Sequence, residues 1–174
     1  GIGSRANTPR VPARRVNLSV PLGLSLDNND NLYIADYGNN MIRRIDAQTG
    51  EILTVAGTGQ RGFSGDGELA IFAQLNRPYN VYADDDGGLF ISDAGNHRVR
   101  HVDLASGVIT TIAGTGTFGY SRTSELAVQT EFKGPFSVIK DADNSLYIAE
   151  YFGHRIRKIT AARPVDVAPE PEVE

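Results

Sequence analysis

The sequence predicts an all-β chain of three tandem units, each an antiparallel sheet of four short strands. The main observation is a segment that returns three times, at residues 32–46, 89–103 and 146–160. Its copies start 57 residues apart both times, without insertion. Short apolar runs in each copy are separated by clusters of Asn, Asp, Gly and Ser, which are typical of turns between strands. Because internal repetition decides the architecture, the fold is expected to be a repeat array.

The first two strands of each unit are predicted to form a hairpin. The first strand follows a proline, a residue that strands tolerate at their beginning, and it is expected at 22–27, 79–84 and 136–141. The second strand is expected at 32–36, 89–93 and 146–150, and it is apolar on both faces. That composition is typical of a strand whose sheet is covered on both sides.

The outer strands are more polar than the inner ones. Ile42 and Ile45 lie among arginines in the third strand, and fourth strands are expected at 52–56 and 109–113. Polarity that increases outward, around inner strands that are covered on both sides, indicates blades of a β-propeller. We expect no substantial helix apart from a short turn at 68–74.

Several segments resemble the NHL repeat, namely residues 33–36, 54–59 and 96–100. The long connection at 62–70, followed by 73–78, is similar to the subset found in bacterial surface proteins and teneurins. This resemblance extends over residues 13–160 in register. It implies a β-propeller, usually six-bladed in this family, so three repeats per chain would be half of a ring. The compartment stays open, with an extracellular or periplasmic location favoured.

The expected domain is a set of three blades over residues 1–162, followed by a tail or linker at 163–174 that is rich in Pro and acidic residues. Approximate blade bounds are 13–57, 58–114 and 115–162, with 1–12 as a divergent interblade loop. Three blades cannot close a ring, and an open array leaves an apolar face at each end. A homodimer would close a six-bladed ring. The fourth strand of the third blade would then come from 165–168 or from the partner's N-terminal segment. If the chain is instead part of a longer one, the missing blades are covalent.

Composition excludes several classes of function. The chain has no cysteine, which excludes disulfides, zinc–thiolate sites and thiol catalysis. Its formal net charge of -4 argues against nucleic acid as a partner. No apolar run is long enough to cross a bilayer, so no membrane insertion is expected.

Charged residues that recur in every copy are predicted to serve the blade. An acid that ends the second strand faces an arginine of the third strand across a short hairpin, where a charge-assisted hydrogen bond is easily made. The pairs are Asp36 with Arg43, Asp93 with Arg100, and Glu150 with Arg157. An alternative is a ring of carboxylates that binds a cation. Calcium requires a defined loop, whereas 27–30 and 84–87 lack its distal glutamate and are interpreted as turns.

Candidate ligand-binding residues differ between copies and are expected on one face of the array. That face collects the turns between second and third strands together with the long connections between blades. The candidates are Tyr37, Asn40, Arg61, Phe63, Tyr79, Asn96, His97, Tyr120, Phe136, Tyr151, Phe152 and His154.

A metal site is an alternative at the histidine position of the repeat. His97 and His154 occupy this position. The resemblance implies a fold shared with the amidating lyases, which bind zinc through histidines in the central cavity. Asn40 occupies the same position in the first copy, and no third histidine is close. We therefore expect no bound cofactor, with calcium and zinc as alternatives.

The sequence thus favours a binding scaffold over an enzyme. Aromatic and arginine side chains are the usual anchors of interfaces, so a protein, peptide or glycan is the expected ligand. The rival hypothesis is a metal-dependent lyase or hydrolase with its site in the central channel of a propeller.

Overall fold

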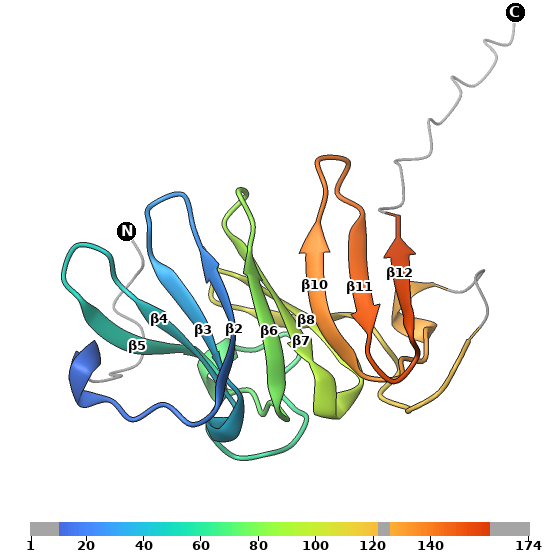
Figure 1. Cartoon of the computed structure of the whole chain (residues 1–174), viewed down its shortest axis with the longest axis horizontal. Helices are drawn as coiled ribbons and strands as arrows, with labels where there is room; N and C mark the ends of the chain where they lie inside the picture. Colours follow the sequence, from blue (N-terminus) through green and yellow to red (C-terminus); the bar gives the residue numbers. More distant parts are fainter. Residues whose placement is uncertain (1–10, 122–125, 161–174) are drawn as a thin grey trace, which may run out of the picture.

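The computed structural model describes residues 11–121 and 126–160, and these residues form three antiparallel sheets side by side (Figure 1). The first sheet has the order β1-β5-β4-β3-β2. Its strands are β1 (Val11–Pro12), β2 (Pro21–Leu26), β3 (Leu32–Asp36), β4 (Met41–Ile45) and β5 (Glu51–Ala56). The second sheet has the order β6-β7-β8-β9, from β6 (Pro78–Ala83), β7 (Gly88–Asp93), β8 (Arg98–Asp103) and β9 (Ile109–Ala113). The third contains β10 (Pro135–Lys140), β11 (Leu146–Glu150) and β12 (Arg155–Ile159).

The predicted all-β class and the order of the strands are confirmed. Each first strand begins at its proline, one residue earlier than expected, and β3, β11 and β9 have the expected bounds. The described helical segments are all 3-10 turns of three residues, and one of them, Ala70–Phe72, lies inside the turn expected at 68–74. The expected fourth strand at 165–168, the tail at 163–174 and most of the N-terminal loop lie outside the described residues.

A β-bulge follows the starting proline in each sheet. The register shifts between Pro78 and Asn80, so Tyr79 has no partner in the ladder, and it shifts again between Pro135 and Ser137 around Phe136. The first sheet has a similar shift between Pro21 and Leu24. A bulge bends the strand and redirects the side chain of the extra residue. In this way the second and third sheets each turn an aromatic residue out of the ladder.

The hydrophobic core lies between sheets. One cluster joins the first sheet to the second, and the other joins the second to the third. Hydrogen bonds also cross these junctions, because Ala83 N–H donates to Ser25 Oγ at 3.0 Å and Val138 N–H donates to Asn80 Oδ1 at 3.3 Å. The first strands β2, β6 and β10 are therefore neighbours, and the sheets fan out from them (Figure 1).

Both ends of the array present uncovered apolar side chains. Leu24 is 60% exposed on β2, whereas Val81 and Val138 at the same position in the repeat are 1% and 0% exposed. At the other end Ile156 is 67% exposed, whereas Ile42 is fully buried at the equivalent position. Each exposed residue lies on the face that another sheet covers elsewhere in the array. These end faces thus have the composition of interior junctions.

No helix in the described part of the chain has the length and apolar character needed to span a membrane.

Candidate functional site

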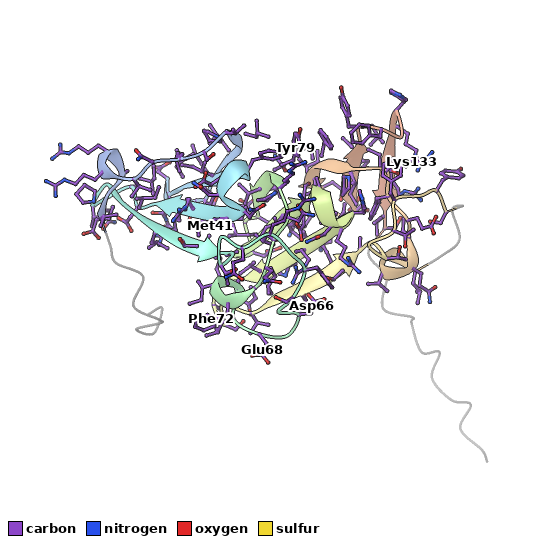
Figure 2. The ribbon with its side chains drawn as sticks, turned by 90° about the horizontal axis from the view of Figure 1, so that it is seen from below. Met41, Asp66, Glu68, Phe72, Tyr79 and Lys133 are labelled. Carbon is purple, nitrogen blue, oxygen red and sulfur yellow. The ribbon has the colours of Figure 1, made fainter. Side chains whose placement is uncertain are left out.

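One face of the array collects the turns after β3, β7 and β11 and the connections between sheets, as expected from the repeat. These segments lie at the lower end of Figure 1, and the hairpins that join β2 to β3, β6 to β7 and β10 to β11 lie at the opposite end. Figure 2 is seen from below this end, with Tyr79 and Lys133 labelled on it. We call it the turn face.

Each recurring acid is hydrogen-bonded to the backbone of the turn face. Each accepts a hydrogen bond from the backbone N–H of the residue two positions before the proline of its first strand. The bonds run from Ser19 to Asp36 at 2.8 Å, from Asn76 to Asp93 at 2.8 Å and from Lys133 to Glu150 at 2.9 Å. Each acid therefore fixes the loop that enters its own sheet.

The recurring arginines contact these acids to different extents. Arg43 Nε lies 3.1 Å from Asp36 Oδ2, and Arg157 Nε lies 3.0 Å from Glu150 Oε1. Arg100 stands farther from its acid, with Nη1 at 3.6 Å from Asp93 Oδ2. Its Nη2 donates instead to Asp66 Oδ1 at 2.9 Å and to the Ser64 carbonyl at 3.1 Å. The middle arginine is therefore shared with the interblade loop, a contact that the repeat alone did not indicate.

The pKa values of two equivalent acids shift in opposite directions. Burial raises the pKa of Asp93 to about 6, although the Asn76 N–H, Asn96 and Arg100 act in the opposite direction. Burial also opposes ionisation of Glu150, but hydrogen bonds from Arg155, the Lys133 N–H and Arg157 bring its pKa below the ordinary value. Burial outweighs the stabilising interactions at Asp93, whereas the combined hydrogen bonds outweigh burial at Glu150.

Five predicted candidates form a continuous row of rings across all three sheets. We call Tyr37, Tyr79, Phe136, Tyr151 and Phe152 the aromatic row. Tyr37 meets Tyr79 edge-on at 5.0 Å between centroids, Tyr79 stacks on Phe136 at 3.7 Å, and Phe136 stacks on Tyr151 at 4.7 Å. Phe152 meets Tyr151 edge-on at 5.1 Å. The two bulges and the turns at 37–39 and 151–154 supply these rings.

The row extends through Phe118, which was not among the candidates. Phe118 is 53% exposed and meets Phe152 at 6.0 Å and His97 at 5.3 Å. Its position in the repeat is that of Arg61, so the difference between the copies was the available signal. Burial and then the neighbouring Arg98 lower the pKa of His97, which favours the neutral ring in this apolar contact.

Arginines cover two other candidate rings. The guanidinium carbon of Arg98 lies 3.8 Å from the centroid of Phe63, and that of Arg155 lies 4.1 Å from the centroid of Tyr120. Phe63 and Tyr120 therefore lie on the turn face as cation–π partners, without a ring contact to the aromatic row among the described residues. Neither of the two arginines was predicted, although both stand where the first copy has Met41.

The remaining candidates either make hydrogen bonds to nearby backbone groups or are exposed to solvent. Asn40 Oδ1 accepts a hydrogen bond from Arg77 N–H at 2.9 Å, and Asn96 Nδ2 donates to the Gly62 carbonyl at 2.7 Å. Arg61 and His154 are exposed. Within residues 11–121 and 126–160, no group of three or more His, Asp and Glu side chains is placed to hold a metal ion.

Comparisons with known proteins give one family and several partial relatives. The family described as NHL repeat matches residues 18–45. The chain is 37% identical over 92 residues to Protein SUPPRESSOR OF QUENCHING 1, chloroplastic, of Arabidopsis thaliana, covering 53% of this chain and 8% of the relative. It is 27% identical over 168 residues to human NHL repeat-containing protein 2, covering 90% of this chain and 23% of the relative. The chain thus spans less than a quarter of either relative.

Among solved structures, an auxiliary nutrient binding protein from Bacteroides ovatus is similar to this chain. It is 29% identical with a TM-score of 0.62, and the match covers 74% of this chain and 34% of that one.

Proposed function

This chain belongs to the NHL-repeat family, and we propose that its propeller blades form a scaffold that binds a protein, peptide or glycan on the turn face. The observation that supports this proposal is the aromatic row. Aromatic rings are strong interface anchors because they bury a large area at a low cost in side-chain entropy. A similar solved structure is described as a nutrient binding protein, which is consistent with a binding role.

The geometry of the row supports a preformed binding surface. Its rings hold one another through stacked and edge-on contacts, so a ligand would not have to order them. At the same time, Tyr151 is 61% exposed and Phe152 is 54% exposed. Rings that are both fixed and accessible suit recognition better than they suit core packing.

Truncation of the exposed rings tests the proposal. Fluorescently labelled wild-type protein would be applied to peptide and glycan arrays beside Tyr151→Ala and Phe152→Ala variants. Phe72→Ala is the matched control, because Phe72 is also exposed and lies away from Tyr79 in Figure 2. We expect the first two variants to lose the wild-type signals and the control to keep them. Equal binding by all four proteins would refute the turn face as the ligand site.

The proposal also includes a homodimer, in which a second copy of the chain covers the two end faces. The support is the internal comparison of Leu24 with Val81 and of Ile156 with Ile42, because each interior equivalent is buried. Full burial of one such side chain contributes about 1.5–3 kcal/mol. A twofold axis along the propeller axis makes both junctions equivalent, so the assembly closes as a six-bladed ring and no end remains.

Light scattering at micromolar concentration tests ring closure. We expect a mass twice that of the 18.8 kDa chain. We expect Leu24→Arg to give the monomer, because it places a charge in the apolar junction. Phe72→Arg, an equally drastic change outside the end faces, should remain dimeric. A stable wild-type monomer would contradict closure by a second copy.

A further inference from the structure

Three tyrosines, one from each sheet, lie in the aromatic row. Tyr37 follows β3, Tyr79 lies in β6 and Tyr151 follows β11. Burial first, then the neighbouring Tyr37 and Tyr151 and a hydrogen bond with Tyr37, raise the pKa of Tyr79, while Arg77 acts in the opposite direction. Tyr37 is in edge-on contact with Tyr79 at 5.0 Å between centroids, and Phe136 is stacked between Tyr79 and Tyr151.

The faces of the central rings are already occupied. Phe136 is stacked on Tyr79 with an interplanar angle of 29° and on Tyr151 with one of 15°. Because two rings cannot stack on the same face, Phe136 is covered on both faces. Tyr37 closes one end of this column with an interplanar angle of 79° to Tyr79. Phe152 lies beside the Phe136–Tyr151 stack, 5.1 Å from Tyr151 and 5.7 Å from Phe136. Tyr79 and Phe136 therefore present mainly their ring edges.

The charge of this edge is positive. The edges of aromatic rings are the positive part of their quadrupole, and phenol hydroxyls donate hydrogen bonds. Arg77 is exposed, with its guanidinium carbon 5.8 Å from the Tyr37 centroid. No ion pair among the described residues involves Arg77. The nearby carboxylates of Asp36 and Glu150 are buried and bonded to arginines.

We propose that the edge formed by Tyr37, Tyr79, Tyr151 and Arg77 binds a carboxylate of an acidic peptide, with the exposed Phe118 and Phe152 beside it for an apolar side chain. This inference rests on the proposed binding function and names its ligand class. Guanidinium and hydroxyl donors together suit a carboxylate, since charge-assisted hydrogen bonds are the strong ones. A sugar would instead require open ring faces for flat stacking, and the column covers those of Phe136.

Fluorescence anisotropy with two designed peptides tests the inference. The probe is fluorescein-labelled Gly-Glu-Phe-Glu-Phe-Glu-Gly, and its matched control has Gln in place of each Glu. We expect the acidic peptide to bind wild-type protein at least about tenfold more tightly than the neutral one, because hydrogen bonds to charged groups contribute most. Arg77→Gln should remove that preference, and Tyr79→Phe should weaken it while keeping the stacked ring. Arg15→Gln, an exposed arginine outside the turn face, should have no effect.

The outcomes separate this inference from the proposed function. If both peptides bind equally and Arg77→Gln has no effect, the carboxylate assignment is overturned, while a loss of binding in Tyr151→Ala would still support the turn face as a site. Absence of binding up to about 1 mM, the weak end of specific affinities, also overturns it. If oligogalacturonate binds and the acidic peptide does not, the ligand is an acidic glycan and the peptide assignment is wrong.

Discussion

Asp93 is expected to make the stability of this chain depend on pH in the weakly acidic range. Burial raises its folded-state pKa from 3.8 to about 6. An acid with a raised folded-state pKa binds its proton more tightly in the folded chain than in the unfolded one. Its contribution to stability is therefore complete below pH 3.8 and is lost as the pH rises through about 6.

The size of this effect follows from the shift. A difference of about two pKa units corresponds to roughly 2–3 kcal/mol of unfolding free energy. Two histidines also contribute to the pH dependence, because burial lowers the pKa of His97 and of His101. Their contribution has the opposite sign, since a neutral buried histidine must take up a proton as the pH falls. Replacing only the carboxyl group of Asp93 isolates its part.

Asp93→Asn removes the titrating group and keeps a side-chain oxygen that can accept the Asn76 N–H. Urea unfolding would be followed for both proteins between about pH 4 and pH 7.5, the window set by the two pKa values. We expect the stability of wild type relative to the variant to fall by roughly 2–3 kcal/mol across this window. Ser92→Ala, a buried and uncharged neighbour, should show a constant difference. A difference between wild type and Asp93→Asn that is flat, or that rises with pH, would refute the assignment.

Three further expectations concern folding. Asp93→Ala should cost about 1–3 kcal/mol, because it leaves the buried Asn76 N–H without its acceptor, while Arg100 keeps Asp66 and the Ser64 carbonyl. Arg100→Ala should cost a similar amount, because it removes the guanidinium nearest to the buried Asp93 carboxyl. In denaturant unfolding the double variant should cost less than the sum by about 1 kcal/mol, and strict additivity would show no coupling. Gly38→Ala should cost about 1–3 kcal/mol by overpacking, since its Cβ would lie 2.8 Å from the Ser19 carbonyl oxygen. Gly50→Ala has no atom within 4 Å of its new Cβ, so it should lose only the free energy cost of its positive φ. Thermal unfolding would compare the two variants, and equal losses of stability would contradict the packing argument. Far-ultraviolet circular dichroism should show a strand-dominated spectrum, and a dominant helical signal would contradict the fold.

Sequence repetition predicted the strands well because their determinants are local. The proline that starts a first strand and the turn residues between strands act within a few positions, so three copies give three concordant signals. The bulges at Tyr79 and Phe136 were not predicted, because a bulge depends on the pairing register between two strands. Sequence alone therefore placed these aromatics on strands without showing that they leave the ladder.

The sequence indicated the residues of the aromatic row as separate candidates, but it did not indicate the contacts between their rings. Tyr37, Tyr79 and Phe136 were chosen one by one, but their contact depends on how neighbouring sheets are rotated, which no single repeat specifies. Phe118 was missed because the search compared residue types at turns and chose Arg61 at that position. Phe63 lies on the turn face, but an arginine from the neighbouring strand covers its ring.

The histidine position of the repeat has a conformational explanation that sequence did not supply. Asn40, His97 and His154 all adopt a left-handed backbone, with φ of 53°, 53° and 49°. Asparagine and histidine are enriched in that region. The exchange of Asn for His between copies thus leaves the turn intact, whatever chemistry the ring performs.

Placing the core between sheets has a consequence for how the chain unfolds. Each blade is stabilised mainly by its neighbours, so stability approximates a sum of nearest-neighbour terms along the array. The middle blade contributes to both interior junctions, whereas each outer blade contributes to one. Amide protons of β7 should therefore exchange most slowly, and the outer blades should fray first. Closing the ring would remove this gradient, because every blade would then have two neighbours, and the exchange profile along the chain would report whether the array is open or closed.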